Sequence, residues 1–140
     1  MPHKTIELRE TISASPAAVW HAITELGPSW LGGFRFETDW QVGGSFSICG
    51  KLQNKTYRET GQLLMLDPPG VVQYSHWSRL WRLPNLPENH AILTLRLEPE
   101  NAETRVLLHH ELPEVQALAE HSQFFWQGAL WRLKRLVETP

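Results

Sequence analysis

The sequence predicts an α+β fold in which a curved antiparallel sheet packs against a long C-terminal helix. An amphipathic helix follows the first strand, about six short strands then follow one another through tight turns, and a long helical pattern ends the chain. Strands joined by short turns favour antiparallel pairing, because parallel neighbours need long crossover connections. We expect the long helix to lie across the concave face of the sheet.

The first two elements are predicted from alternation and from capping residues. Residues 5–13 partly alternate apolar and polar side chains, as in a half-buried strand. Ser15 is a favourable N-cap and Pro16 suits the first helical position, so a helix is expected to begin here. Gly27-Pro28 is expected to stop it.

Six further strands are predicted from short apolar segments separated by turn residues. These segments are 36–40, 45–49, 57–66, 71–77, 91–97 and 104–110. The turns between them carry Gly43-Gly44, Gln53-Asn54-Lys55, Asp67-Pro68-Pro69-Gly70 and residues 99–103. Residues 78–88 contain two prolines and no strand pattern, so they are expected to form the longest loop.

A long helix is predicted from Pro113 to the end of the chain, with an interruption near His121 as an alternative. Its apolar side chains follow the spacing of one helix face: Val115, Leu118, Ala119, Ser122, Trp126, Ala129, Leu130, Leu133 and Val137. Phe124, Phe125 and Trp131 widen this stripe beyond what one face against a sheet usually needs.

Length and charge exclude several classes of protein. A chain of 140 residues suits a single domain, 1–140, and 41% hydrophobic with 20% charged residues is typical of a globular protein. Thirteen Lys and Arg against 15 Asp and Glu give a formal charge of −2. The chain therefore lacks the basic field that nucleic acid or an anionic membrane would need, and no apolar run is long enough for membrane insertion.

The cysteine and histidine residues give no sign of a disulfide, a metal or a cofactor. Cys49 is the single cysteine, and no signal-peptide pattern is present, so a reduced, cytoplasmic location is expected. The seven histidines have no metal-binding spacing, and no glycine-rich phosphate loop follows a strand. No distinctive nucleophile and base pair supports covalent catalysis.

Four blocks of sequence occur in an order that is typical of one family. They are ISASPAAVWHAIT (12–24), VGGSF (42–46), GQLLMLDPPGVVQY (61–74), and residues 93–110 followed by WQGALWRLKRLVE (126–138). With these blocks the chain resembles small bacterial proteins similar to the C-terminal domain of the activator of the heat-shock-protein-90 ATPase. This family lies within the START-like (SRPBCC) helix-grip superfamily.

The resemblance implies six or seven antiparallel strands wrapped around the C-terminal helix, with short helices after the first strand. It also implies a pocket between helix and sheet that binds apolar or amphipathic molecules, and a connection with the stress response. A minority of the superfamily catalyse cyclisations or ring cleavage. The co-chaperone resembled here uses a separate N-terminal domain to stimulate the ATPase, for which 140 residues leave no room, so full activator function is not expected.

Four polar side chains are candidates for the wall of such a pocket. Period-two spacing places His76 on one face with Val72 and Tyr74, and His110 on one face with Val106 and Leu108. Polar groups in an apolar cavity usually orient a ligand. The alternative is that each histidine only satisfies a local hydrogen bond or lies at an open strand end.

Tyr57 and Glu59 share a strand face and could add a hydroxyl and a carboxylate to the same cavity. Desolvation there would raise the pKa of the carboxyl and suit it to acid–base chemistry. The sequence nevertheless favours a surface position for Glu59, beside Arg58 or Lys55.

The seven tryptophans are expected to divide into two groups. Trp20, Trp30, Trp40 and Trp126 are expected to pack within the fold. Trp77 and Trp81 lie in or beside a loop that also holds Leu80, Leu83 and Leu86. Such an apolar loop is either a lid over a pocket or part of an interface such as a homodimer, and Trp131 suits either role.

These observations predict a protein that binds a small hydrophobic or aromatic ligand between the C-terminal helix and the sheet. The predicted ligand-binding residues are Tyr57, Tyr74, His76, Trp77, Trp81, Leu93, Leu95, Leu108, His110, Trp126 and Leu130. One alternative is a cyclase or hydratase type of enzyme that uses His76, His110 or Glu59 as acid or base; it requires at least two of these groups to converge on one cavity. The other is a chaperone-assisting module with a filled interior and an apolar surface around residues 78–88.

Overall fold

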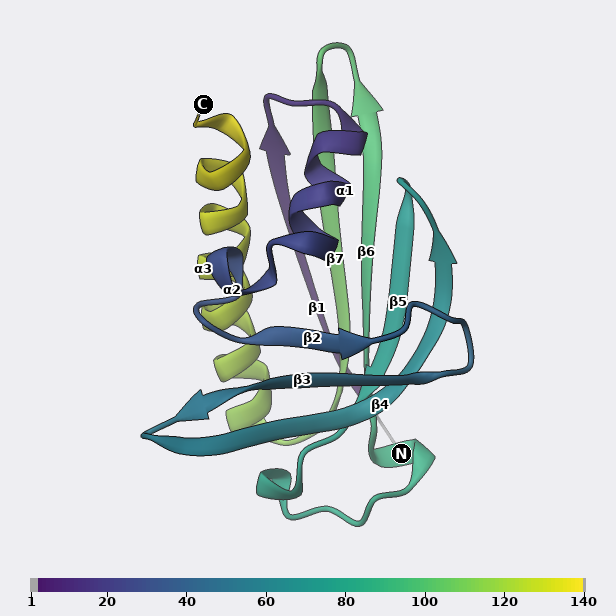
Figure 1. The fold of residues 1–140 in the computed structure, drawn as a ribbon. Helices are drawn as coiled ribbons and strands as arrows, with labels where there is room; N and C mark the ends of the chain where they lie inside the picture. Colours follow the sequence, from purple (N-terminus) through teal and green to yellow (C-terminus); the bar gives the residue numbers. More distant parts are fainter. Residues whose placement is uncertain (1–2, 140) are drawn as a thin grey trace.

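The structure, a computed structural model, describes residues 3–139 and confirms the α+β fold (Figure 1). Seven antiparallel strands form one curved, unclosed sheet around the long helix α3 (Gln116–Glu138). The strands are β1 (His3–Ile12), β2 (Arg35–Thr38), β3 (Ser45–Leu52), β4 (Lys55–Asp67), β5 (Val71–His76), β6 (Ala91–Glu100) and β7 (Glu103–Pro113). The short helices are α1 (Pro16–Glu25), α2 (Gly27–Trp30) and the 3-10 turns η1 (Arg79–Trp81) and η2 (Pro87–Asn89).

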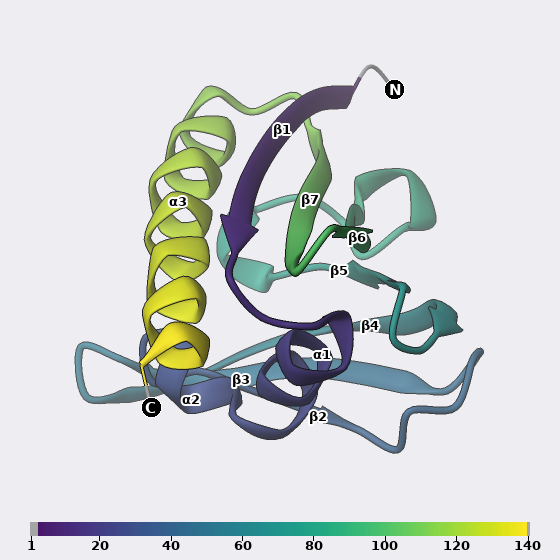
Figure 2. The same cartoon turned by 90° about the horizontal axis from the view of Figure 1, so that it is seen from above.

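The strand order in the sheet is β1-β7-β6-β5-β4-β3-β2, so all strands after α2 pair with their neighbours in sequence. The exception is β1, which pairs with β7, so the first and last strands of the chain are neighbours in the sheet. Seen from above, the sheet bends around α3, with β1 and β7 on one side and β2 to β4 across the other (Figure 2). This curvature leaves an interior between helix and sheet that side chains must fill.

Both predicted limits of α1 are confirmed, and a short second helix that the sequence did not predict follows it. The hydroxyl oxygen of Ser15 accepts a hydrogen bond from the backbone N–H of Ala18 at 3.2 Å, and Pro16 is the first helical residue. Helix α1 ends at Glu25, before Gly27-Pro28, and after a break at Leu26 these two residues begin α2. Proline is favoured in a first helical turn because its missing N–H would have no partner there.

The long helix begins three residues later than predicted. Leu112 and Pro113 still belong to β7, where they pair with Lys4 and His3 of β1, and α3 starts only at Gln116. It then runs without interruption through His121.

The apolar stripe of α3 is narrower than the sequence suggested. Of the three residues that seemed to widen it, Phe125 is half-buried, whereas Phe124 is 81% and Trp131 54% exposed. One aromatic side chain of the three therefore contributes to the interior.

Period-two alternation correctly predicts the inner face of the sheet. The buried set comprises Val72, Tyr74 and His76 on β5, Ala91, Leu93, Leu95 and Leu97 on β6, and Val106, Leu108 and His110 on β7. Two of these ten side chains are imidazoles, and both lie toward the end of the sheet at which α3 begins. The inner face is thus apolar except near that end.

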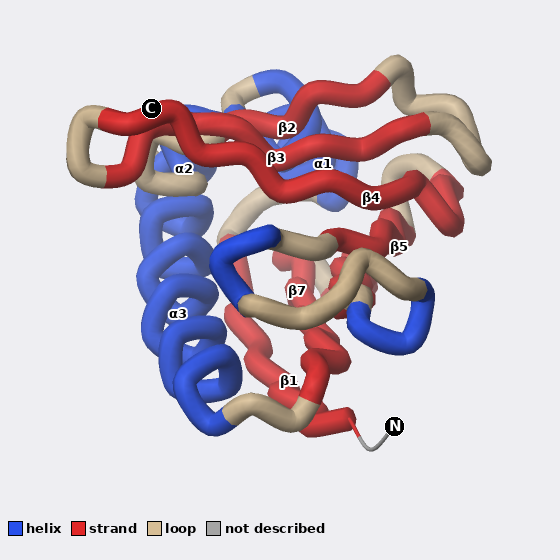
Figure 3. Tube along the Cα trace, turned by 90° about the horizontal axis from the view of Figure 1, so that it is seen from below, coloured by secondary structure: helices blue, strands red, loops and turns tan. Residues whose placement is uncertain are grey.

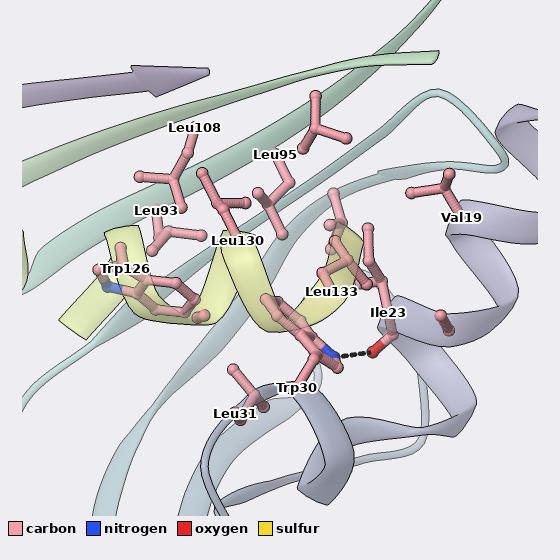
Figure 4. Close-up of a cluster of buried hydrophobic side chains, with 14 of the residues drawn as sticks. Val19, Ile23, Trp30, Leu31, Leu93, Leu95, Leu108, Trp126, Leu130 and Leu133 are labelled. Atoms are coloured by element: carbon pink, nitrogen blue, oxygen red, sulfur yellow. Dashed lines mark hydrogen bonds between the residues drawn. The ribbon is translucent and has the colours of Figure 1, made fainter. Parts of the chain in front are cut away.

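The second half of α3 lies over a filled core. Leu130 and Leu133 pack with Leu93, Leu95 and Leu108 of the sheet, and Trp30 closes the cluster from α2 (Figure 4). The indole N–H of Trp30 donates to the carbonyl oxygen of Ile23 at 3.3 Å, so this fully buried ring leaves no polar atom unpaired.

The loop between β5 and β6 crosses the opposite end of the molecule, where α3 begins (Figure 3). Two local contacts order it: the Ser78 hydroxyl accepts from the N–H of Leu80, and the Trp77 indole N–H donates to the carbonyl oxygen of Leu83 at 3.1 Å. Within residues 3–139 no helix has the length and apolar character needed to cross a membrane.

Candidate functional site

A cavity of about 350 Å³ lies between the first half of α3, the inner face of the sheet and the turn η1. Helix α3 contributes six lining residues, and the other side chains come from strands β2 to β5 and β7 and from the segments beside α2 and β5. The lining residues are Leu31, Phe34, Phe36, Ile48, Leu52, Tyr57, Glu59, His76, Leu80, Trp81, His110, Leu112, Ala117, Leu118, His121, Ser122, Phe125 and Trp126. Most of them are apolar, as in typical ligand sites.

Five polar side chains in the cavity wall form one hydrogen-bonded chain. The Tyr57 hydroxyl donates to one Glu59 oxygen, and the other Glu59 oxygen lies 2.5 Å from Nδ1 of His76. The Nε2 atoms of His76 and His110 are 2.8 Å apart, and Nδ1 of His110 is 2.6 Å from the Ser122 hydroxyl. The chain joins β4, β5, β7 and α3 across the interior.

Glu59 is held as a carboxylate by this chain. Burial opposes its charge, but the adjacent His76 and the Tyr57 hydroxyl outweigh burial and keep the pKa of Glu59 below its ordinary value. An ionised carboxylate only accepts hydrogen bonds, so Nδ1 of His76 carries a proton and donates it. The same environment raises the pKa of the Tyr57 hydroxyl, through burial first and then the charge of Glu59.

His110 is neutral, because burial and then the neighbouring His76 lower its pKa well below the ordinary range. A neutral imidazole donates from one nitrogen and accepts at the other. When His76 is also neutral, His110 donates from Nε2 to His76, and the Ser122 hydroxyl donates to Nδ1 of His110. In this arrangement the proton on Nδ1 of His76 sets the direction of the two hydrogen bonds that continue the chain to Ser122.

The position of Glu59 differs from the surface site that the sequence favoured. Its side chain is 15% exposed and faces the cavity beside Tyr57, while Arg58 points to the other side of β4 and pairs with Glu37. Alternation along the strand gives two possible faces, and only the placement of β4 in the sheet, where Glu59 pairs with Ile48 of β3, decides which of them is inward.

Five of the 11 predicted ligand-binding residues line the cavity, namely Tyr57, His76, Trp81, His110 and Trp126. Tyr74, Leu93, Leu95, Leu108 and Leu130 are buried in the core, beyond its wall. Trp77 is half-buried and spans the β5–β6 loop through its bond to Leu83. The sequence correctly identified inward faces, but it could not distinguish the filled part of the interior from the hollow part.

Several lining residues were not predicted. Phe34, Phe36, His121, Ser122 and Phe125 belong to this group. The spacing of α3 placed Ser122 on the inner face, and a serine within an apolar stripe was the available signal for a polar partner. Phe34 and Phe36 reach the cavity through the bend after α2, for which no local pattern exists.

Tyr74 has a buried hydroxyl with no hydrogen-bond partner among residues 3–139. Its ring stacks on Phe46, with centroids 4.1 Å apart. We expect Tyr74→Phe to raise the free energy of unfolding by about 1 kcal/mol, because an unsatisfied buried hydroxyl costs stability. Urea denaturation would measure the change. A clear loss of stability would contradict this account and indicate that the hydroxyl binds a water or a ligand.

Trp81 is the tryptophan that closes the cavity. Its ring stands edge-on to His76, with centroids 5.5 Å apart, and Leu80 beside it is exposed at the cavity mouth. Trp131 instead lies on the outer face of α3 with the Arg135 guanidinium 5.0 Å from its ring centre. Of the three tryptophans left open by the sequence, one therefore lines the cavity.

A second hollow of about 440 Å³ lies on the outer face of the sheet, over β1, β5, β6 and β7. Most of its lining is polar or charged, including Glu7, Arg9, Gln73 and Arg96. Although it is larger, it has neither the apolar wall nor the hydrogen-bonded chain of the inner cavity. The part of the chain described here contains no group of three or more His, Cys, Asp or Glu arranged to hold a metal ion.

A curved antiparallel sheet around a long C-terminal helix, with a cavity between them, defines a START-like helix-grip protein. The sequence model of the family described as activator of Hsp90 ATPase homolog 1-like protein matches residues 13–138. The chain belongs to this family. No curated protein sequence matches it significantly.

Solved structures of similar proteins agree with the fold. ChR145 from Cytophaga hutchinsonii is 28% identical, with a TM-score of 0.79 over 99% of this chain and 97% of its own. Protein CV1439 from Chromobacterium violaceum is 24% identical, with a TM-score of 0.78 over 98% and 99%. The Aha1 dimer from Colwellia psychrerythraea is 22% identical, with a TM-score of 0.74 over 97% of both chains.

Proposed function

We propose that the protein binds a small hydrophobic or aromatic molecule in the cavity between α3 and the sheet. The observation that carries this proposal is an apolar cavity of about 350 Å³ with a few polar groups on its wall. Burial of apolar ligand surface against Phe, Trp and Leu side chains would supply affinity at about 25 cal/mol per Å², offset by ordering costs. The polar groups would orient the ligand.

Native mass spectrometry of protein purified from its own host tests this proposal, since a co-purifying small molecule would be seen directly. A thermal-shift screen with apolar compounds complements it, because a ligand that binds the folded state raises Tm. We expect at least one apolar compound to stabilise the protein. An empty protein that responds to no compound would contradict the proposal.

Ala117→Trp should block the cavity without disturbing the core. Ala117 is exposed and lies in the first turn of α3, at the cavity mouth, so a large side chain there can cover the opening. We expect the thermal shift by any ligand to fall by more than half. The matched control is Ala102→Trp, at an exposed position in the β6–β7 turn that does not line the cavity. Equal ligand responses in the two variants would place the binding site elsewhere.

An acid–base enzyme of the cyclase or hydratase type is a second candidate. It is favoured by one observation: Glu59, His76 and His110 meet in one hydrogen-bonded chain on the cavity wall. The enzyme hypothesis drawn from the sequence requires at least two of these groups to converge on one cavity. A ligand recovered after incubation with the protein would then differ in mass or chromatographic retention, and Glu59→Gln would abolish the change. Recovery of unchanged ligand contradicts this candidate.

We propose a second copy of the chain as a partner and the cytoplasm as the location of the protein. A chaperone-assisting role predicted a filled interior, and the cavity weighs against it. A homodimer is compatible with the exposed Phe124 and Trp131, which lie seven residues apart on one face of α3. The buried, unpaired Cys49 is compatible with the cytoplasm.

A further inference from the structure

We infer that the ligand of the cavity is an organic cation, an apolar molecule that carries a protonated amine. This inference rests on the proposed binding function and narrows it to one chemical class. Three features of the cavity carry it: its charge, the hydrogen-bonding capacity of its polar groups, and the aromatic rings around them.

Glu59 supplies the fixed charge of the cavity. It is the only acidic residue among the described lining residues, and none of these is Lys or Arg. The remaining groups on the wall that can take up or release a proton are Tyr57, His76, His110 and His121. His110 is neutral, and the Tyr57 hydroxyl keeps its proton. The fixed charge that the described lining residues place on the wall is therefore negative.

The hydrogen bonds within the chain use most donor groups of the polar lining residues and leave acceptor sites free. His76 and His110 use both ring nitrogens within the chain, and the Tyr57 hydroxyl proton is directed at Glu59. Each Glu59 oxygen accepts one such bond, whereas a carboxylate has about four acceptor sites. Because Glu59 lines the cavity, a ligand group that meets its free acceptor sites must be a donor.

Aromatic rings line the same cavity as this acceptor. The Phe34 ring stands edge-on to Tyr57 at 5.9 Å and to Phe125 at 6.2 Å, and Phe125 stands edge-on to Trp126 at 5.1 Å, each between centroids. Trp81 adds a further ring beside His76. The negative faces of such rings attract cations, most strongly where water is excluded. A carboxylate within a group of aromatic side chains thus favours an ammonium group with an apolar body.

The same features disfavour other ligand classes. A ligand carboxylate or phosphate would place a second negative charge beside Glu59 in an environment of low polarity, which is strongly unfavourable. A neutral alcohol can donate to Glu59 but gains no charge interaction. The order of affinity expected for one molecular skeleton is amine, then alcohol, then carboxylate.

Phenethylamine, phenethyl alcohol and phenylacetate test this order, because they share a ring and differ in the polar group. Isothermal titration at about pH 8 should give an amine affinity about tenfold above that of the alcohol, with phenylacetate weakest. In Glu59→Gln the advantage of the amine over the alcohol should disappear, while the alcohol affinity stays within about threefold. Glu98→Gln is the control, since Glu98 is an exposed carboxylate that pairs with Arg105 away from the cavity.

The outcomes distinguish the cation preference from the proposed ligand binding on which it rests. If the alcohol or phenylacetate binds as tightly as the amine, and Ala117→Trp abolishes that binding, the cavity binds ligands but the cation preference is wrong. Retention of the amine preference in Glu59→Gln would also overturn it. If none of the three probes binds and no compound of the wider apolar screen raises Tm, both the binding function and the cation preference are wrong.

Discussion

Gly61→Ala is expected to lower the free energy of unfolding by more than about 3 kcal/mol and to abolish ligand binding. A Cβ atom at position 61 would lie 1.8 Å from the carbonyl oxygen of Ser75, 2.5 Å from its carbonyl carbon and 3.0 Å from the Cα of His76. All three are backbone atoms, so no side chain can rotate to make room. Strand β4 would have to move away from β5.

The close approach at Gly61 is part of the bend that forms the cavity. Regular pairing of β4 with β5 extends only to Leu63 and Tyr74, and beyond it the contact continues through a bridge between Thr60 and Trp77. Glycine permits two backbones to approach closely where a sheet bends. Because Glu59 and His76 lie on either side of this contact, moving β4 would separate them.

Urea unfolding and a thermal-shift assay would measure the two effects of Gly61→Ala. Gly70→Ala is the matched control: its Cβ would meet only the Asp67 carbonyl oxygen at 3.5 Å, an ordinary contact, and its backbone is not in the left-handed region. That change should be neutral or slightly stabilising. Similar stabilities of the two variants would show that the strands can separate at position 61 at little cost.

Regular elements of the fold could be predicted from the sequence because local chemistry determines them. Ser15 and Pro16 mark the start of a helix, and alternation along β5, β6 and β7 identifies the inner face. The end of α1 before Gly27-Pro28 was also predicted, but the start of α2 at these residues was not. Helix α2 packs Trp30 against Trp126 of α3, a long-range contact that no local pattern indicates.

The site could be predicted only in part, for a similar reason. His76 and His110 were found because they interrupt apolar alternation, but the sequence did not show that they bond to each other. The inward position of Glu59 depends on the placement of β4 in the sheet, where Glu59 pairs with Ile48 of β3, and the position of the cavity depends on where α3 departs from the filled core. Both are properties of the assembled sheet and helix.

His76→Phe is expected to destabilise the protein by about 3 kcal/mol at neutral pH, the lower end of the range for leaving a buried charge without its partner. The replacement keeps a ring of similar shape but removes the partner of Glu59, whose side chain is only 15% exposed. It also leaves Nε2 of His110 without its hydrogen bond. The unpaired Glu59 carboxylate then accounts for most of the lost stability, because burial is the largest influence on its pKa and disfavours its charged form.

The pH dependence identifies this cause. In the wild type the pKa of Glu59 is depressed, so its contribution to stability is present above the unfolded-state pKa and is lost as the pH falls through the folded-state value. In His76→Phe, burial without the imidazole raises the pKa of Glu59, so the variant becomes less stable as the pH rises through that value. The difference in stability between the two proteins should therefore shrink as the pH falls from about 8 toward about 5.

The double variant Glu59→Gln/His76→Phe separates the buried charge from other effects. Without the carboxylate, the stability difference from the wild type should no longer depend on Glu59 ionisation, and about half of the lost stability should return. The remaining cost reflects His110, whose Nε2 still has no partner. Urea unfolding of the wild type, both single variants and the double variant across this pH range completes the cycle. If the double variant were no more stable than His76→Phe, an unpaired Glu59 charge would not be the cause, and the role of His76 would lie in packing against Trp81 and His110.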